Sequence, residues 1–166
     1  SNANLAGIVF PQNVTATASA AFQKTGMTSV TVLKDISYGS NAFDSCASLV
    51  SVTVEEGVTE IGNYMFQNTK LTSVTLPNSV TKIGASAFNG CSLTTINFGQ
   101  GVKTIENSAF QNCGELTEII LPDATETLGQ NAFGDCPKLA KISLGKNMKT
   151  LEAYCFVGYS KGCPLL

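Results

Sequence analysis

The stretch LTSVTLPNSVTKIGASAFNGC, residues 71–91, decides the fold, because it recurs along the whole chain at intervals of 22 or 23 residues. Each copy begins with an apolar residue and carries a phenylalanine near its end. The leading residues are Leu5, Met27, Leu49, Leu71, Leu93, Leu116 and Leu139, and the phenylalanines are Phe22, Phe43, Phe66, Phe88, Phe110, Phe133 and Phe156. Self-similarity at this period predicts a solenoid in which each coil packs on its neighbours.

The first part of each copy has the pattern of a short, half-buried strand. Apolar residues stand at its first, fourth and sixth positions, as in Leu71, Val74 and Leu76. The fourth and sixth residues point to the same side, because side chains alternate along a strand. Val or Ile at position four, with Thr between, suits a pleated surface. We therefore predict one strand per copy, with its apolar side in the core.

The second part of each copy predicts a turn that carries the phenylalanine inward. An apolar pair such as Val80 and Ile83 comes first, and the sequence Ala-Phe closes the turn. Ser or Asn precedes the phenylalanine by two or three positions and is typical of a helix cap. These capping candidates are Ser19, Asn41, Ser86, Ser108 and Asn131. We expect a single helical turn here.

Two irregularities interrupt the period. The second copy lacks one residue between Ile36 and Phe43, so that Tyr38 and Gly39 stand where an Ile-Gly pair stands later. From Leu116 onward the interval lengthens to 23 residues. Because both changes fall outside the predicted strands, we expect turns to absorb them.

The charged residues test the stacking, because they were not used to align the copies. Stacking should place Glu118 beside Lys141, Asp123 beside Lys146, Lys34 beside Glu56, and Glu126 between Lys103 and Lys149. Opposite charges on neighbouring strands are favourable. Acidic residues dominate positions 104–135, and lysines dominate positions 138–161. This uneven distribution of charge would either orient a partner at the C-terminal end or pair the last coils with one another.

The repeat pattern L-x-x-I-x-L-P-x-x-V-x-x-I-G-x-x-A-F-x-x-C resembles the BspA-like leucine-rich repeats, also called the Treponema pallidum type. The resemblance covers residues 5 to 158, with Thr25 and Thr69 in place of the late Cys. It implies a right-handed solenoid of about seven units, with a concave parallel β-sheet and a convex side of short strands and helical turns. It also implies a secreted or cell-surface bacterial protein that adheres to host proteins or other cells.

The domain organisation follows from the extent of the repeats. We assign residues 1–3 to an expression scar, 4–158 to the repeat array and 159–166 to a C-terminal tail or cap.

Composition argues against several classes of function. The chain has no His, Arg or Trp, so catalysis by imidazole is excluded and nucleic-acid binding has little support. No apolar run approaches the ~18 residues of a membrane helix. We expect no catalytic residues, no cofactor, no enzyme activity and no membrane insertion.

The cysteines form a column of their own. Cys46, Cys91, Cys113 and Cys136 each follow a repeat phenylalanine by three residues. We interpret them as small buried apolar residues, with a zinc site or a functional disulfide as the alternative. No metal site is predicted, and a terminal disulfide between Cys155 and Cys163 is a separate alternative.

The outward side of the strands is the candidate binding surface, on the concave face. Its candidate residues are Thr28, Thr31, Ser51, Thr53, Thr72, Ser73, Thr75, Thr94, Thr95, Asn97, Glu118 and Lys141. Short hydroxyls could contact an extended polypeptide or a glycan, although the face lacks the Trp, Tyr and Arg anchors of typical hot spots. The plain alternative is that these Ser and Thr residues only serve strand propensity and solubility.

We therefore predict a non-enzymatic, extracellular binding or adhesion module that recognises a protein, from the host or its matrix, with a glycan as the other ligand class. The first alternative is a structural spacer that presents another domain of a larger surface protein. A remote third is an ice-binding lattice of Thr. Open sheet edges near Leu5 and Leu139 would also permit self-association.

Overall fold

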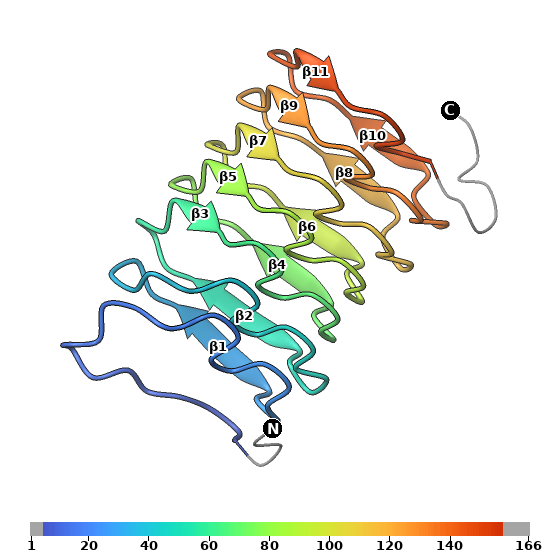
Figure 1. Ribbon diagram of the computed structural model, residues 1–166. Coiled ribbons are helices and arrows are strands. Elements are labelled where there is room, and N and C mark those ends of the chain that lie inside the picture. The colour runs from blue at the N-terminus through green and yellow to red at the C-terminus, as the bar shows by residue number, and fades with distance from the viewer. Residues whose placement is uncertain (1–4, 158–166) are drawn as a thin grey trace.

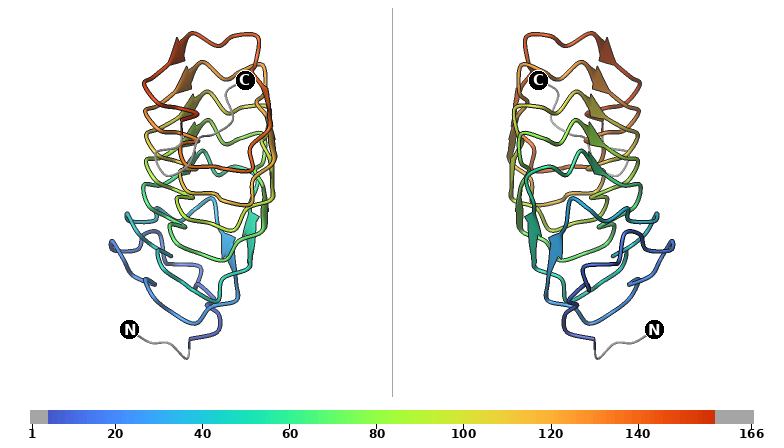
Figure 2. Two further views of the ribbon diagram at one scale, coloured as in Figure 1. Left: turned by 90° about the vertical axis from the view of Figure 1, so that its right-hand side faces the viewer. Right: turned by 90° about the vertical axis from the view of Figure 1, so that its left-hand side faces the viewer.

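The computed structural model describes residues 5–157, which form a parallel β-solenoid (Figure 1). Its strands lie in two rows on opposite sides of the stack (Figure 2). The first row contains β1 (Ser29–Val32), β2 (Ser51–Val54), β4 (Ser73–Thr75), β6 (Thr95–Asn97), β8 (Glu118–Ile120) and β10 (Lys141–Ser143). The second row contains β3 (Glu60–Ile61), β5 (Lys82–Ile83), β7 (Thr104–Ile105), β9 (Thr127–Leu128) and β11 (Thr150–Leu151). The predicted boundaries at residues 1–3 and 159–166 lie outside the described residues.

Both rows follow from the alternation of apolar and polar residues. In β1 the side chains of Val30 and Val32 are buried, while those of Ser29 and Thr31 are exposed. In the second row Ile61 and its equivalents in β5, β7 and β9 are fully buried. The core therefore lies between the two rows, as the sequence predicts.

The register confirms one parallel first-row strand in each repeat from the second to the seventh, but the first row is not one continuous sheet. Its strands pair as β1–β2, β4–β6 and β8–β10. At the first break the spacing from the repeat phenylalanine to the next leading residue changes from six positions, at Leu49, to five, at Leu71, but a change of the same size between Met27 and Leu49 leaves β1 paired with β2. A change of this size also occurs between β6 and β8. A change in this spacing therefore does not by itself interrupt the row. The second row forms an unbroken five-stranded sheet.

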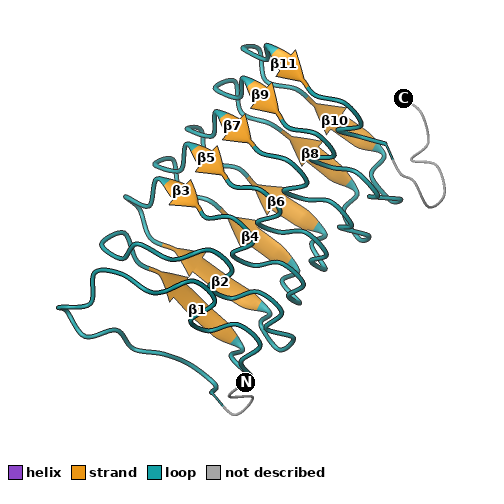
Figure 3. Ribbon diagram, viewed as in Figure 1, coloured by secondary structure: helices purple, strands orange, loops and turns teal. Residues whose placement is uncertain are grey.

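The predicted helical turns are wrong, because residues 5–157 contain strands and turns but no helix (Figure 3). A helix requires each N–H to bond to the carbonyl four residues back. Here the N–H groups of Tyr64, Phe66 and Asn68 instead donate to carbonyls of the next coil, each at 2.8 Å. No segment within the described range is thus a helix that could cross a membrane.

Left-handed backbone angles break the helical geometry at the same place in each coil. Two residues before the phenylalanine, φ is positive at Ala20, Asn41, Tyr64, Ser86, Ser108, Asn131 and Tyr154. Four of the predicted helix caps are among these residues, whereas an N-cap residue has a β-type backbone. Asn and Ser therefore stand here as turn residues that accept positive φ, and not as caps.

The first predicted copy does not form a strand, so six first-row strands replace the seven units expected. Val9 is 92% exposed, and Ala16 makes only an isolated bridge to Ser37. The end coil can pair on one side alone, and Gly7 weakens the predicted strand further. Its Phe10 still packs edge-on against Phe22, with ring centroids 5.7 Å apart.

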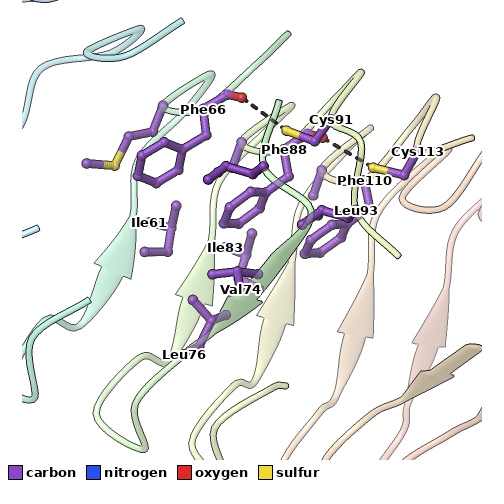
Figure 4. Packing of buried hydrophobic residues seen from close by; sticks show 14 of the residues in the cluster. Ile61, Phe66, Val74, Leu76, Ile83, Phe88, Cys91, Leu93, Phe110 and Cys113 are labelled. Atoms are coloured by element: carbon purple, nitrogen blue, oxygen red, sulfur yellow. Dashed lines mark hydrogen bonds between the residues drawn. The ribbon is translucent and has the colours of Figure 1, made fainter. Parts of the chain in front are cut away.

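The phenylalanines form a continuous stack along the core, as predicted. Neighbouring rings from Phe22 to Phe156 lie nearly parallel, with interplanar angles of at most 20°. Their centroids are as close as 5.1 Å, between Phe110 and Phe133. Figure 4 shows three consecutive rings of this stack.

Candidate functional site

The twelve predicted site residues lie on the outward side of the first row. All are exposed except Glu118, which is half-buried. The register aligns them in columns: Ser51 is opposite Ser29, Thr95 is opposite Ser73, and Lys141 is opposite Glu118. Because the row is interrupted, these residues are distributed over three pairs of strands, β1–β2, β4–β6 and β8–β10.

A groove of about 590 Å³ lies at the break between β6 and β8. Four predicted site residues line it, namely Thr94, Thr95, Asn97 and Glu118. Further lining residues are Ile96, Phe98, Gln100, Thr117, Ile120, Leu121, Pro122 and Asp123. This volume is within the range of ~300–1,000 Å³ that is typical of ligand sites.

Ile120 lies on the outward face but is not among the twelve predicted site residues. Its side chain is 59% exposed and borders the groove. It occupies the outward column of Thr31, Thr53, Thr75 and Asn97, so that it is a large apolar side chain among polar ones. An apolar residue at an outward strand position was the available signal.

Ion pairs hold the coil that bears β8 to the coil that bears β10. The predicted pairs Glu118–Lys141, Asp123–Lys146 and Glu126–Lys149 are confirmed, each with an N–O distance of 2.7 Å. Glu115–Lys138, at 2.6 Å, was not predicted. The acidic and basic segments of the sequence thus pair the last coils.

Two other contacts of charged residues, at Lys34 and Lys82, differ from the predicted charge pattern. The carboxylate that reaches Lys34 belongs to Glu55, whose Oε2 accepts the Lys34 backbone N–H at 2.9 Å, and not to the predicted Glu56. Lys82 also bridges Glu60 and Glu106, at 3.1 and 3.0 Å, across three coils of the second row.

Acid should loosen the last coil before the rest of the stack. Hydrogen bonds from Lys146 and Lys149 lower the pKa values of Asp123 and Glu126. Their stabilising effect is therefore complete above the unfolded pKa of about 4 and is lost as the pH falls through the lower folded values. We expect amides 140–151 to lose hydrogen-exchange protection between pH 5 and pH 2 in advance of amides 73–98.

The Lys146→Gln/Lys149→Gln double variant is the control for this prediction. It should show the faster exchange of 140–151 already at pH 5, with little further change in acid. Uniform loss of protection along the wild-type chain would contradict the assignment.

The cysteine column is buried, as predicted, and it also makes hydrogen bonds. The thiols of Cys46, Cys91, Cys113 and Cys136 donate to the carbonyl of the phenylalanine one coil earlier, at 3.1–3.3 Å, and Figure 4 shows two of these bonds. Thr25 and Thr69 continue the column, because their hydroxyls contact the Cys46 and Cys91 sulfurs, each at 3.3 Å. The column therefore satisfies buried backbone carbonyls.

The cysteines offer little reactive chemistry. Burial raises the pKa of Cys91 to about 11, and it also raises the pKa values of Cys113 and Cys155. Within residues 5–157 no three His, Cys, Asp or Glu side chains lie together as metal ligands would. The predicted alternative of a Cys155–Cys163 disulfide involves Cys163, which lies outside the described residues.

The thiol column should resist modification in the folded protein. At pH 8 only about one thiol in a thousand is ionised when its pKa is near 11, and the thiolate is the reactive form. In a Cys163→Ser variant we expect Cys91 and Cys113 to react with a disulfide reagent at least about 100-fold more slowly in buffer than in denaturant. Rapid labelling of the native protein, followed by mass spectrometry, would show that the column opens.

Comparisons with known proteins agree with this architecture. A family model described as "BspA type Leucine rich repeat region" matches six copies, over residues 1–91 and 36–162. No curated protein matches the chain. Among solved structures, a leucine-rich repeat protein from Bacteroides ovatus is similar at 22% identity and a TM-score of 0.63, with 92% of this chain and 48% of that chain covered.

Two further structures share the fold. The Treponema pallidum leucine-rich repeat protein is 20% identical with a TM-score of 0.56, and the match covers 95% of this chain and 76% of that one. The pneumococcal vaccine antigen PcpA is 20% identical with a TM-score of 0.53, covering 80% and 43%. The chain thus spans less than half the length of the Bacteroides and pneumococcal structures.

Proposed function

Since this chain belongs to the BspA-type leucine-rich repeat proteins, we propose that it is a non-enzymatic module that binds a protein through the outward face of its first row. The observation that supports this most is the β6–β8 groove, where an exposed isoleucine lies beside short polar side chains. An apolar centre within a polar rim is the usual anatomy of a protein interface.

The chemistry of the face suits an extended polypeptide. Hydroxyl and amide side chains on β4 and β6, including Thr75 and Asn97, offer donors and acceptors to a backbone at modest desolvation cost. Ile120 supplies an exposed apolar contact beside these polar side chains. Glu118 and Asp123 are already paired with lysines, so they limit which charges a partner can bring to the groove.

Binding should depend on the centre of the groove. A screen of host and matrix proteins should yield a ligand with a micromolar or lower Kd, and Ile120→Ala should weaken it at least tenfold, because the apolar contact is lost. The triple change of Thr72, Thr75 and Thr94 to Lys should abolish binding, measured by biolayer interferometry.

Thr150→Lys is the control for a lysine introduced away from the first row, because Thr150 lies on β11 of the second row. It should leave the Kd unchanged. If the Ile120 and triple variants bind as tightly as the parent, the first row is not the binding face. A glycan array run beside the protein screen tests the other ligand class.

The location and the wider role belong to the same proposal. Family membership supports an extracellular module that adheres to a host or matrix protein, and labelling of intact cells that express the full-length gene tests the location. The alternative is a spacer that presents another domain, which the greater length of two similar structures favours. A full-length protein that keeps its binding when the first row is mutated would support the spacer. Self-association through the open ends is checked by size-exclusion chromatography.

A further inference from the structure

A second hollow, of about 560 Å³, lies on the opposite side of the stack, between the second and third coils. It is lined by Thr15, residues 32–38, Ser40, residues 58–60, Gly62, Asn63 and Met65. The hollow coincides with the one-residue deletion between Ile36 and Phe43. The shortened second coil forms no second-row strand, and its Ser37 instead bridges back to Ala16.

The deletion leaves β3 as the edge of the second-row sheet, and within residues 5–157 β5 is the one strand that pairs with it (Figure 1). Backbone hydrogen bonds close the hollow at both ends, from Glu55 to Val32 and from Asn41 to Asn63, each at 3.0 Å. In the next coil, the Thr81 N–H donates to the Thr59 carbonyl at 2.9 Å, and the Gly84 N–H donates to the Ile61 carbonyl at 2.8 Å. On its other side, the β3 edge faces the hollow.

The glycines of this column show that the space is open. A Cβ atom on Gly84 would lie 2.8 Å from the Asn63 backbone nitrogen of the coil below, and one on Gly129 would lie 2.6 Å from the equivalent nitrogen of Asn107. A Cβ atom on Gly62 would meet nothing within 4 Å. The backbone that lies under Gly84 and Gly129 is therefore absent under Gly62, which follows β3 directly.

We propose that this hollow binds an extended polypeptide segment, which pairs through its backbone with the free edge of β3. A sheet edge presents alternating N–H and C=O groups and is a template for an added strand. The buried side chains of Ile36, Val58 and Met65 form an apolar floor, and Ser37 and Asn63 lie at the rim. The site is separate from the first-row groove, so either can fail without the other.

The aromatic residue of the hollow argues for a peptide and against a sugar. The Tyr38 ring is packed between Phe10 and Phe43, with centroids 6.1 and 5.7 Å away. Its hydroxyl accepts the Leu33 N–H at 3.1 Å. The ring is therefore occupied by the core, and the hollow offers mainly backbone and short polar groups.

The experiment uses the blocked peptide acetyl-TKIGA-amide, which copies residues 81–85, the segment that pairs with β3 on its other side. Titration into isotope-labelled protein should give saturable chemical-shift changes confined to residues 34–40 and 58–63. A peptide with proline in place of isoleucine cannot donate the central N–H and should bind at least tenfold more weakly.

Gly62→Gln is the matching protein variant. Its side chain would fill the hollow, and Glu106 and Glu152 occupy the same repeat position, so the coil accepts a long side chain there. With an unchanged melting temperature, this variant should lose the shifts, while Ile120→Ala should keep them. The proposal is overturned if the parent shows no localised shifts, if both peptides bind equally, or if folded Gly62→Gln binds like the parent.

Discussion

Replacement of Phe88 by Ala is expected to lower the free energy of unfolding by about 3–5 kcal/mol, the usual cost of removing a fully buried aromatic ring. The Phe88 side chain has no solvent exposure. Its ring lies between those of Phe66 and Phe110, with centroid distances of 5.5 and 5.2 Å. The cavity would therefore remove packing from both neighbouring coils, whose only contacts are with their neighbours in the stack.

The measurement is urea denaturation followed by circular dichroism, with Phe156→Ala as the control. Phe156 is half-buried and stacks on Phe133 at the longer centroid distance of 6.0 Å. We expect this end variant to lose less than half as much stability as Phe88→Ala. Equal losses at the two positions would mean that the stack does not carry the stability of the central coils.

The core could be predicted from sequence because every inner coil repeats the same environment. A phenylalanine at a fixed position meets the equivalent phenylalanine above and below, so periodicity alone predicts the contact. The same logic predicted the Glu118–Lys141 pair, which needs only the correct register. Contacts that recur from coil to coil can therefore be predicted from the sequence alone.

The prediction of helical turns was wrong because the backbone N–H groups of this segment can bond either within their own copy or to a neighbouring coil. Asn41 and Ser86 suggested helix caps, but their N–H groups donate to the next coil at 3.0 Å. Propensity within one copy cannot show that a neighbouring coil offers a better acceptor. The tertiary contact decided the conformation of the turn.

The β6–β8 groove and the hollow beside β3 arise where successive copies differ, whereas a repeat pattern describes only what the copies share. The β6–β8 groove lies where the spacing from the repeat phenylalanine to the next leading residue rises from five to six, and the space beside β3 adjoins the coil that lacks one residue between Ile36 and Phe43. The sequence shows where each length change occurs, but whether a turn closes over it depends on the packing of two coils. The strand pattern places Ile120 on the outward face, but it does not show that Ile120 borders a groove.

Replacement of Gly84 by Ala should destabilise the protein by about 1–3 kcal/mol, whereas the same change at Gly62 should be neutral or stabilising. A Cβ atom at Gly84 would press on the backbone of Asn63 and Gly62 in the coil below, which must shift to admit it. At Gly62 the new methyl group would enter the open hollow, and loss of glycine's freedom in the unfolded chain adds up to about 1 kcal/mol of stability.

Comparison of Gly84→Ala with Gly62→Ala isolates the steric effect of the coil below, because the two glycines occupy the same position in successive repeats. Glu106 fills that position in the following repeat, so the repeat's own backbone does not forbid a side chain there. Urea denaturation of the two variants gives the comparison directly. If Gly62→Ala loses as much stability as Gly84→Ala, then the second coil lies as close under β3 as any other coil does. In that case the hollow could not admit a peptide strand.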